Sequence, residues 1–256
     1  MHIFFDIDNT LISHKGIHHV PPETHEALKL LRISGHTTAI ATGRGAFLTF
    51  LAAKELGINN IVCSGGAQIF VNGNEIHRVM FPDKHIDAFL KVAKKFPALT
   101  AAIDDKFLYA SEAFSPYFEY FNAQAGYDCI RPLSELRKAI ICYIMIPPEN
   151  LTHEHGLFFS PPENVKLELM HAFTEARSEG TSKWLGIKKL IAHEKANIND
   201  VIVFGDGPND IDMLEHAKIG VAVGNASDIV KSAADYVCDD IDNGGILSAC
   251  KHLGLI

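Results

Sequence analysis

Short, almost wholly apolar runs alternate with amphipathic segments near the start of the chain. The runs cover residues 2–5, 37–41 and 60–63, and runs of this length predict strands that are buried on both faces. Between them, one segment begins at Pro22 and ends before Gly35, and another spans residues 46–56 and ends at Gly57; both have the spacing and the end signals of helices. This alternation of strand and helix predicts a doubly wound parallel sheet.

A different pattern begins after Gly65-Gly66. Residues 68–71 and 75–79 flank Asn72-Gly73-Asn74, which is a hairpin signal. Beyond the hairpin, the chain predicts helices at 84–95 and 113–124 and strands at 100–103, 106–110, 140–146 and 165–170. Strands that follow one another directly, mixed with helices, indicate an α+β module with an antiparallel sheet.

The first pattern resumes at Ser182. A helix passes through Leu185, Leu190 and Ile191, a strand spans 201–204, a helix 210–216, a strand 219–223 and a last helix 245–252. We therefore predict an α/β protein. Residues 1–80 and 178–256 form a Rossmann-like, doubly wound parallel-sheet core, and residues 81–177 form an inserted α+β module.

Composition and charge exclude several classes of protein. The net charge is −8 and no Lys/Arg-rich run occurs, which argues against a nucleic-acid-binding protein. The five cysteines are odd in number and none form CxxC, so neither a disulfide framework nor a zinc site is indicated. The chain has no signal-peptide pattern and no apolar run of about 20 residues. We expect a cytoplasmic protein without a membrane partner, whose oligomeric state the sequence does not reveal.

Chemically active side chains gather where the predicted core strands end. In open α/β sheets, ligands bind at the carboxyl edge of the strands, so we expect these side chains to lie together. They fall in four stretches, namely Asp6-Ile7-Asp8-Asn9-Thr10, Thr42-Gly43-Arg44, Lys183, and Gly205-Asp206-Gly207-Pro208-Asn209-Asp210.

The residue types in these stretches suit phosphoryl transfer. Carboxylates gathered in one place repel one another and an incoming phosphate, so the site needs a cation, and hard oxygen ligands favour Mg²⁺. The metal, Lys183 and the Thr42 hydroxyl can position and neutralise a phosphoryl group. One carboxylate can attack as a nucleophile, and a second carboxyl two residues further on can transfer the proton.

The four stretches, in this order, resemble the four motifs of the haloacid dehalogenase-like hydrolase superfamily, and the inserted module resembles the large cap of its Cof-type (IIB) branch. The resemblance implies that Asp6 is the nucleophile and Asp8 the general acid and base. It also implies that Asp210 orients Lys183 or the waters of the metal. The implied Mg²⁺ ligands are Asp6, the Asp8 backbone carbonyl and Asp206, and the implied phosphate-binding groups are Thr42, the Gly43 amide, Lys183 and Asn209.

Three positions depart from the pattern of that branch. Asn9 replaces a common glycine, Gly65 stands where an asparagine is usual, and Trp184 follows the lysine where a glycine is usual. Trp184 could line the substrate pocket or pack between the domains, and Arg44 could form a structural ion pair or belong to the site. These questions concern contacts with the substrate rather than the chemistry.

We therefore predict a phosphatase that hydrolyses a small phosphorylated metabolite, such as a sugar phosphate, with Mg²⁺ and through a phospho-aspartyl intermediate. One alternative is a phosphomutase, which returns the phosphoryl group to a sugar hydroxyl. Another is a receiver-like module that holds phosphate without catalysis. The inserted module and the second acidic stretch near the C-terminus argue against that alternative.

Overall fold

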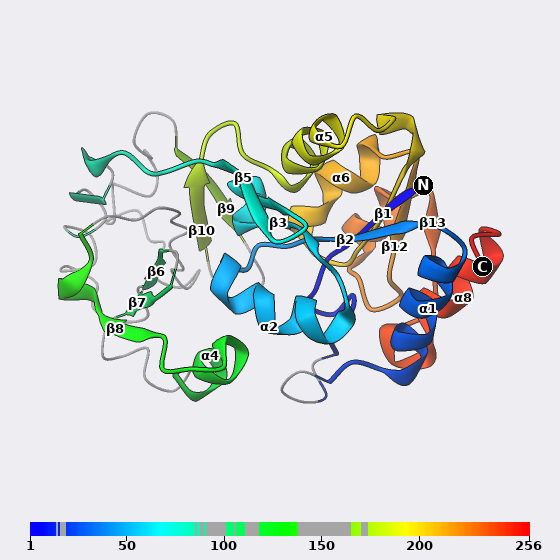
Figure 1. Cartoon of the computed structure of the whole chain (residues 1–256), viewed down its shortest axis with the longest axis horizontal. Coiled ribbons are helices and arrows are strands. Elements are labelled where there is room, and N and C mark those ends of the chain that lie inside the picture. The colour runs from blue at the N-terminus through cyan, green and yellow to red at the C-terminus, as the bar shows by residue number, and fades with distance from the viewer. Residues whose placement is uncertain are drawn as a thin grey trace.

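One large sheet organises the chain in the computed structural model (Figure 1). The structure describes residues 1–13, 15, 19–84, 86–87, 90, 101–104, 106–110, 118–137, 165–169 and 174–256. Within these residues the large sheet has eight strands in the order β13-β12-β11-β1-β2-β3-β4-β5. The strands are β1 (His2–Phe5), β2 (Thr37–Ala41), β3 (Asn60–Cys63), β4 (Gln68–Val71), β5 (Asn74–Arg78), β11 (Val201–Gly205), β12 (Ile219–Ala222) and β13 (Tyr236–Val237).

Strand β1 lies near the middle of this sheet, between strands from distant parts of the chain. His2 is in register with Thr37 of β2 on one side and with Val201 of β11 on the other, and both pairings are parallel. The strands from β13 to β3 are parallel, and β4 and β5 add an antiparallel hairpin at one edge. The predicted α/β fold with a mostly parallel sheet is confirmed.

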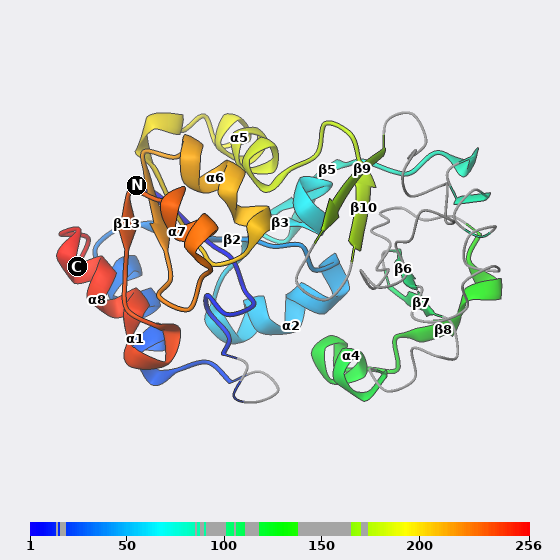
Figure 2. The same cartoon turned by 180° about the vertical axis from the view of Figure 1, so that it is seen from behind.

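Helices cover both faces of the sheet, as the alternation of side chains along β1 requires. Ile3 and Phe5 pack in one cluster with residues of α1, α2 and α8, whereas Phe4 packs in the other with residues of α5, α6 and α7. Figures 1 and 2 show the two helical layers. The helices are α1 (Pro22–Ile33), α2 (Ala46–Leu56), α5 (Lys183–His193), α6 (Ile211–His216), α7 (Asp228–Ser232) and α8 (Gly245–His252).

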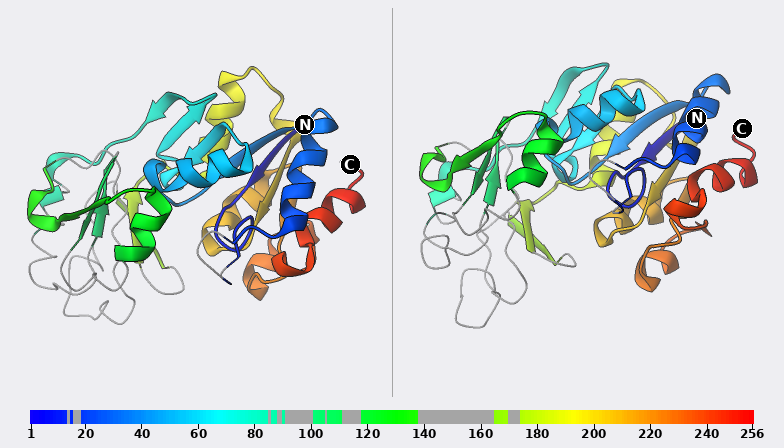
Figure 3. Two further views of the ribbon diagram at one scale, coloured as in Figure 1. Left: turned by 60° about the horizontal axis from the view of Figure 1, so that its bottom comes forward. Right: turned by 90° about the horizontal axis from the view of Figure 1, so that it is seen from below.

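The inserted region forms smaller elements at one end of the molecule (Figure 3). A three-stranded sheet contains β6 (Ala101–Ile103), β7 (Leu108–Ala110) and β8 (Ile130–Pro132), and a separate hairpin contains β9 (Val165–Leu169) and β10 (Thr174–Ser178). Helix α4 is Phe118–Ala125. The sequence did not indicate β8, β10, α7 or β13. The strand expected at 140–146 and most of the helix expected at 84–95 lie outside the described residues. The domain boundaries stay a prediction.

The inserted region packs against the first turn of α2. Phe47 and Leu48 share one apolar cluster with Ile103 and Leu108, and Phe118 and Phe121 of α4 pack against it. A Cβ atom on Gly45 would lie 2.8 Å from Cγ2 of Ile103, so the residue immediately before α2 has no room for a side chain unless Ile103 moves. The inserted region is therefore held beside the segment Thr42-Gly43-Arg44.

Two expectations from composition bear on the described residues. Among the described residues, Cys63, Cys129, Cys238 and Cys250 are free thiols. Within the described part of the chain, no helix has both the length and the apolar character that crossing a membrane requires. The cytoplasmic location stays a prediction.

Candidate active site

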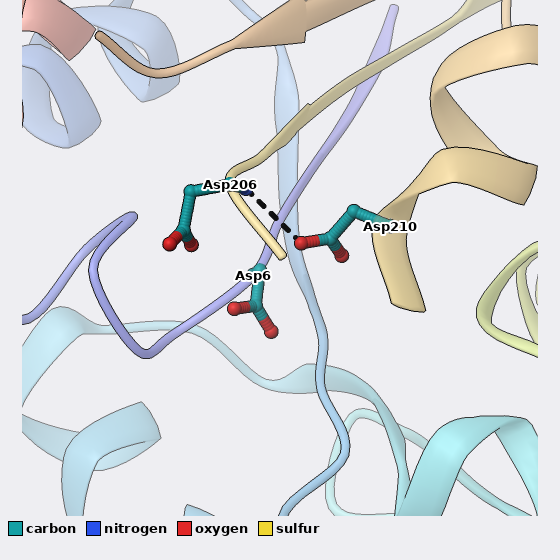
Figure 4. A group of neighbouring side chains, drawn as sticks. All are labelled: Asp6, Asp206 and Asp210. Carbon is teal, nitrogen blue, oxygen red and sulfur yellow. Dashed lines mark hydrogen bonds between the residues drawn. The ribbon is translucent and has the colours of Figure 1, made fainter. Parts of the chain in front are cut away.

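Three aspartates converge at the carboxyl edge of the large sheet (Figure 4). Asp6 follows β1, Asp206 follows β11, and Asp210 ends the short turn that precedes α6. One carboxylate oxygen from each lies within 4.8 Å of those of the other two. The sheet order places β1 beside β11, so residues that are 200 positions apart in the sequence meet here.

Lys183, the first residue of α5, contacts two of these aspartates. Its Nζ donates to Oδ1 of Asp6 at 2.7 Å and to Oδ1 of Asp210 at 2.6 Å, and its side chain is 0% exposed. Burial alone would lower the pKa of this ammonium group, but the charges of Asp210 and Asp6 outweigh burial and raise the pKa. Lys183 therefore stays protonated and supplies a fixed positive charge.

The single positive charge of Lys183 does not balance the three aspartates, so the site favours binding of a cation. Burial raises the pKa of Asp6 to about 7, and the neighbouring Asp210 and Asp8 add to the increase, whereas Lys183 opposes it. Burial and the charges of Asp6 and Asp210 raise the pKa of Asp206 to about 8. Buried carboxylates in this state are stabilised by a bound metal. Because all the donors are hard oxygens, the residues present fit Mg²⁺.

Asp210 is held by its neighbours through both carboxylate oxygens. Oδ1 accepts from Lys183, and Oδ2 accepts from the backbone amides of Asp206 at 3.1 Å and Gly207 at 2.9 Å. Asp206 in turn accepts a hydrogen bond from the Thr10 hydroxyl at 3.0 Å. These contacts hold Asp210 between Lys183 and the backbone of the Asp206 loop, and its predicted role in orienting Lys183 or the waters of the metal stays a prediction.

The Asp8 carboxylate forms an ion pair with the Arg44 guanidinium group. Nε of Arg44 donates to Oδ2 of Asp8 at 2.9 Å, and Nη2 donates to Oδ1 at 2.5 Å. The Arg44 side chain is 7% exposed and that of Asp8 is 39% exposed, so Arg44 is buried whereas the Asp8 carboxylate is partly accessible to solvent. Burial and the charge of Asp8 raise the pKa of Tyr120 in α4, whereas Arg44 opposes the increase.

The expected phosphate-binding residues lie on neighbouring turns. Thr42 is buried at the end of β2, and its hydroxyl accepts from the Arg44 amide at 3.2 Å, with Gly43 between them. Asn209 lies in the same turn as Asp210. The structure thus brings all the predicted residues to one edge of the sheet, and their individual roles stay predictions.

The structure accounts for two of the three unusual positions. Asn9 has a φ of 58°, a left-handed conformation that glycine and asparagine adopt more readily than other residues. Its carbonyl accepts from Nδ2 of Asn225 at 2.9 Å, a contact that no sequence signal indicated. Trp184 lies in the apolar cluster beneath α5 and α6 and stacks on His216, with ring centroids 6.0 Å apart. It is therefore a residue of the core layer.

Comparison with known proteins agrees with this geometry. The family whose pattern matches residues 3–249 is described as haloacid dehalogenase-like hydrolase. YkrA of Bacillus subtilis (strain 168), a protein named as a phosphatase, is 31% identical over 99% of this chain and 98% of its own length. The 5-amino-6-(5-phospho-D-ribitylamino)uracil phosphatase YcsE of the same organism is 25% identical over 98% and 94%.

Solved structures extend the similarity to the whole fold. The structure of BT4131, described as a sugar phosphatase of subclass IIB in the same superfamily, superposes with a TM-score of 0.85 at 30% identity, covering 100% of this chain and 99% of that one. The family match over residues 3–249 and the superposition of the whole fold agree with each other. The chain belongs to the haloacid dehalogenase-like hydrolase family and is a phosphatase of that family.

Proposed function

We propose that the protein hydrolyses a small phosphomonoester by way of a phosphorylated Asp6, in a reaction that requires Mg²⁺. The observation that carries the proposal is the contact between Lys183 and Asp6, at 2.7 Å, beside two further carboxylates. Lys183 neutralises the negative charge that would otherwise keep a phosphate away from the nucleophile.

The reaction has two displacements. In the first, a carboxylate oxygen of Asp6 attacks phosphorus, the bond from phosphorus to the ester oxygen breaks, and the departing alcohol takes a proton from Asp8. In the second, Asp8 removes a proton from water, the water oxygen attacks phosphorus, and the bond to Asp6 breaks. Inorganic phosphate is released, and both carboxyl groups return to their starting states.

The other predicted residues of the site would bind the metal or the phosphoryl group, or orient Asp8. Asp6, the Asp8 carbonyl and Asp206 would hold Mg²⁺, which offsets the charge of the phosphoryl group. Lys183, Thr42, the Gly43 amide and Asn209 would hold the phosphoryl oxygens. Arg44 holds the Asp8 carboxylate by two hydrogen bonds, so one of these bonds has to open before Asp8 carries the proton of the first step.

The substrate we propose is a sugar phosphate or a sugar-alcohol phosphate. BT4131 is described as a sugar phosphatase, and the name of YcsE specifies a substrate with a phospho-ribityl group. Both compounds carry phosphate on a polyhydroxylated carbon chain. The open side of this site, where Asp8 is 39% exposed, is where such a leaving group would project.

The test is phosphate release from an aryl phosphate and from a panel of sugar phosphates, with Mg²⁺ or with a chelator. Asp6→Asn should lower turnover by at least about 10⁴-fold, because the nucleophile is lost. Asp128→Asn serves as the control, since the Asp128 side chain is 77% exposed on the inserted region. Retained turnover in Asp6→Asn would sink the nucleophile assignment, and an isomerised sugar phosphate without free phosphate would indicate a mutase.

A further inference from the structure

The turn that follows β3 has an unusual backbone. Ser64, Gly65 and Gly66 have φ values of 52°, 59° and 89°, so three successive residues are left-handed. Glycine adopts this conformation freely, whereas a side chain with a Cβ atom is strained in it. Gly65 and Gly66 therefore fit the turn, and Ser64 is the residue that the turn disfavours.

The Ser64 hydroxyl adds a second unfavourable feature. The residue is 3% exposed, and its Oγ has no hydrogen-bond partner within the described part of the chain. A buried hydroxyl that makes no hydrogen bond destabilises the folded state. The left-handed backbone and the unpaired hydroxyl of Ser64 are thus both unfavourable for stability. Glycine at this position would avoid both effects.

Ser64 lies directly beside the predicted phosphate-binding segment. Its amide donates to the carbonyl of Arg44 at 2.8 Å, and the next amide, from Gly65, donates to the carbonyl of Thr42 at 3.1 Å. The far side of the turn is fixed as well, because a Cβ atom on Gly66 would lie 1.9 Å from the carbonyl oxygen of Ser182. The turn is therefore wedged between the Thr42 segment and the start of the helix that carries Lys183.

We propose that Ser64 is a substrate-positioning residue whose hydroxyl donates a hydrogen bond to an oxygen atom of the bound phosphomonoester. This inference rests on the proposed function. Backbone strain and buried polar groups without a hydrogen-bond partner lower stability, and they occur most often at functional sites. At such sites a bound ligand can supply the missing hydrogen bond. The Ser64 side chain is enclosed like that of Lys183, for which we propose a role in phosphate binding.

The test compares Ser64→Gly and Ser64→Ala with the wild-type protein. Ser64→Gly should raise the Tm by about 2 to 4 °C, because it removes the strain and the unpaired hydroxyl. It should lower kcat/KM by about 3- to 10-fold, the effect of one lost hydrogen bond. Lys195→Gly is the matched control, since Lys195 has a φ of 54° on an exposed turn after α5. Its Tm should rise while kcat/KM stays unchanged.

Inorganic phosphate distinguishes the two kinds of oxygen atom. If Ser64 contacts a phosphoryl oxygen, inhibition by phosphate and turnover of an aryl phosphate weaken by the same factor in both Ser64 variants. If it contacts an oxygen of the leaving group, only turnover of the sugar phosphate falls. Unchanged kcat/KM for every substrate overturns the assignment, as does a lower Tm in Ser64→Ala, which would reveal a structural hydrogen bond. Absence of turnover in the wild-type protein would instead refute the proposed function.

Discussion

Replacing Asp210 by asparagine tests whether this buried carboxylate holds the site together. Asp210 is 0% exposed and accepts three hydrogen bonds, from Lys183 and from the amides of Asp206 and Gly207. Asparagine has nearly the same shape, but one of its two acceptor positions becomes an NH₂ group. At least one buried donor would therefore face another donor.

The expected loss of stability follows from these contacts. Removing the charge of one partner in a buried ion pair costs about 3 to 5 kcal/mol. A chain of this size loses about 2 to 4 °C of Tm per kcal/mol, so Asp210→Asn should lower the Tm by roughly 6 to 20 °C. Thermal unfolding followed by circular dichroism in a chelator at about pH 8 measures this loss.

Asp6→Asn is the matched comparison, because Asp6 contacts the same Lys183 nitrogen. Burial raises the pKa of Asp6 to about 7, so without metal at about pH 8 its carboxylate is unfavourable in the fold, and a neutral amide relieves repulsion from the other aspartates. Lys183 retains Asp210 as a partner. Asp6→Asn should therefore unfold at or above the wild-type Tm. If it loses as much stability as Asp210→Asn, the reasoning that separates the two aspartates is wrong.

Two further predictions concern pH and packing. Burial raises the pKa of Asp6 from 3.8 to about 7 and that of Asp206 from 3.8 to about 8. As the pH rises above about 4, these two carboxyl groups lose their protons in the unfolded chain but keep them in the metal-free folded protein. The stability of the metal-free protein therefore falls towards pH 8. Mg²⁺ should therefore raise the Tm more at about pH 8 than at about pH 5.5, as scanning fluorimetry can measure; an equal rise at both would refute this. Gly66→Ala should destabilise the protein far more than Gly73→Ala. A Cβ atom at position 66 would lie 1.9 Å from the Ser182 carbonyl oxygen, whereas a Cβ atom at position 73 would have no atom within 4 Å. Equal losses of stability for the two variants in urea unfolding would contradict this prediction.

The sequence predicts the core of the fold well because its strands are buried on both faces. Apolar runs such as residues 2–5 and 201–204 have few alternatives to a central parallel strand, and both lie in buried strands of the sheet. Strand β13 has two residues and helix α7 has five, so neither is long enough to show a period. Strands β8 and β10 also escaped prediction, since their pairing depends on tertiary contacts that short segments do not reveal.

The site was predictable to the extent that its residues sit at the ends of elements. Asp6, Thr42, Lys183 and Asp206 were placed by strand ends and by the start of one helix. The pairing of Asp8 with Arg44 was left open, because a sequence does not show which way a long side chain turns. Ser64 gave no signal, since its strain exists only in the folded turn.

The central position of β1 has a consequence for synthesis of the protein. One of its neighbours, β2, leaves the ribosome soon after β1, but the other, β11, begins only at Val201. At about 5 to 20 residues per second, roughly 8 to 33 s separate the emergence of β2 from that of β11. Throughout that interval one side of β1 has no partner strand, and Asp6 does not have Asp206 beside it. The nascent chain therefore carries an open strand edge at the place where the enzyme will later react.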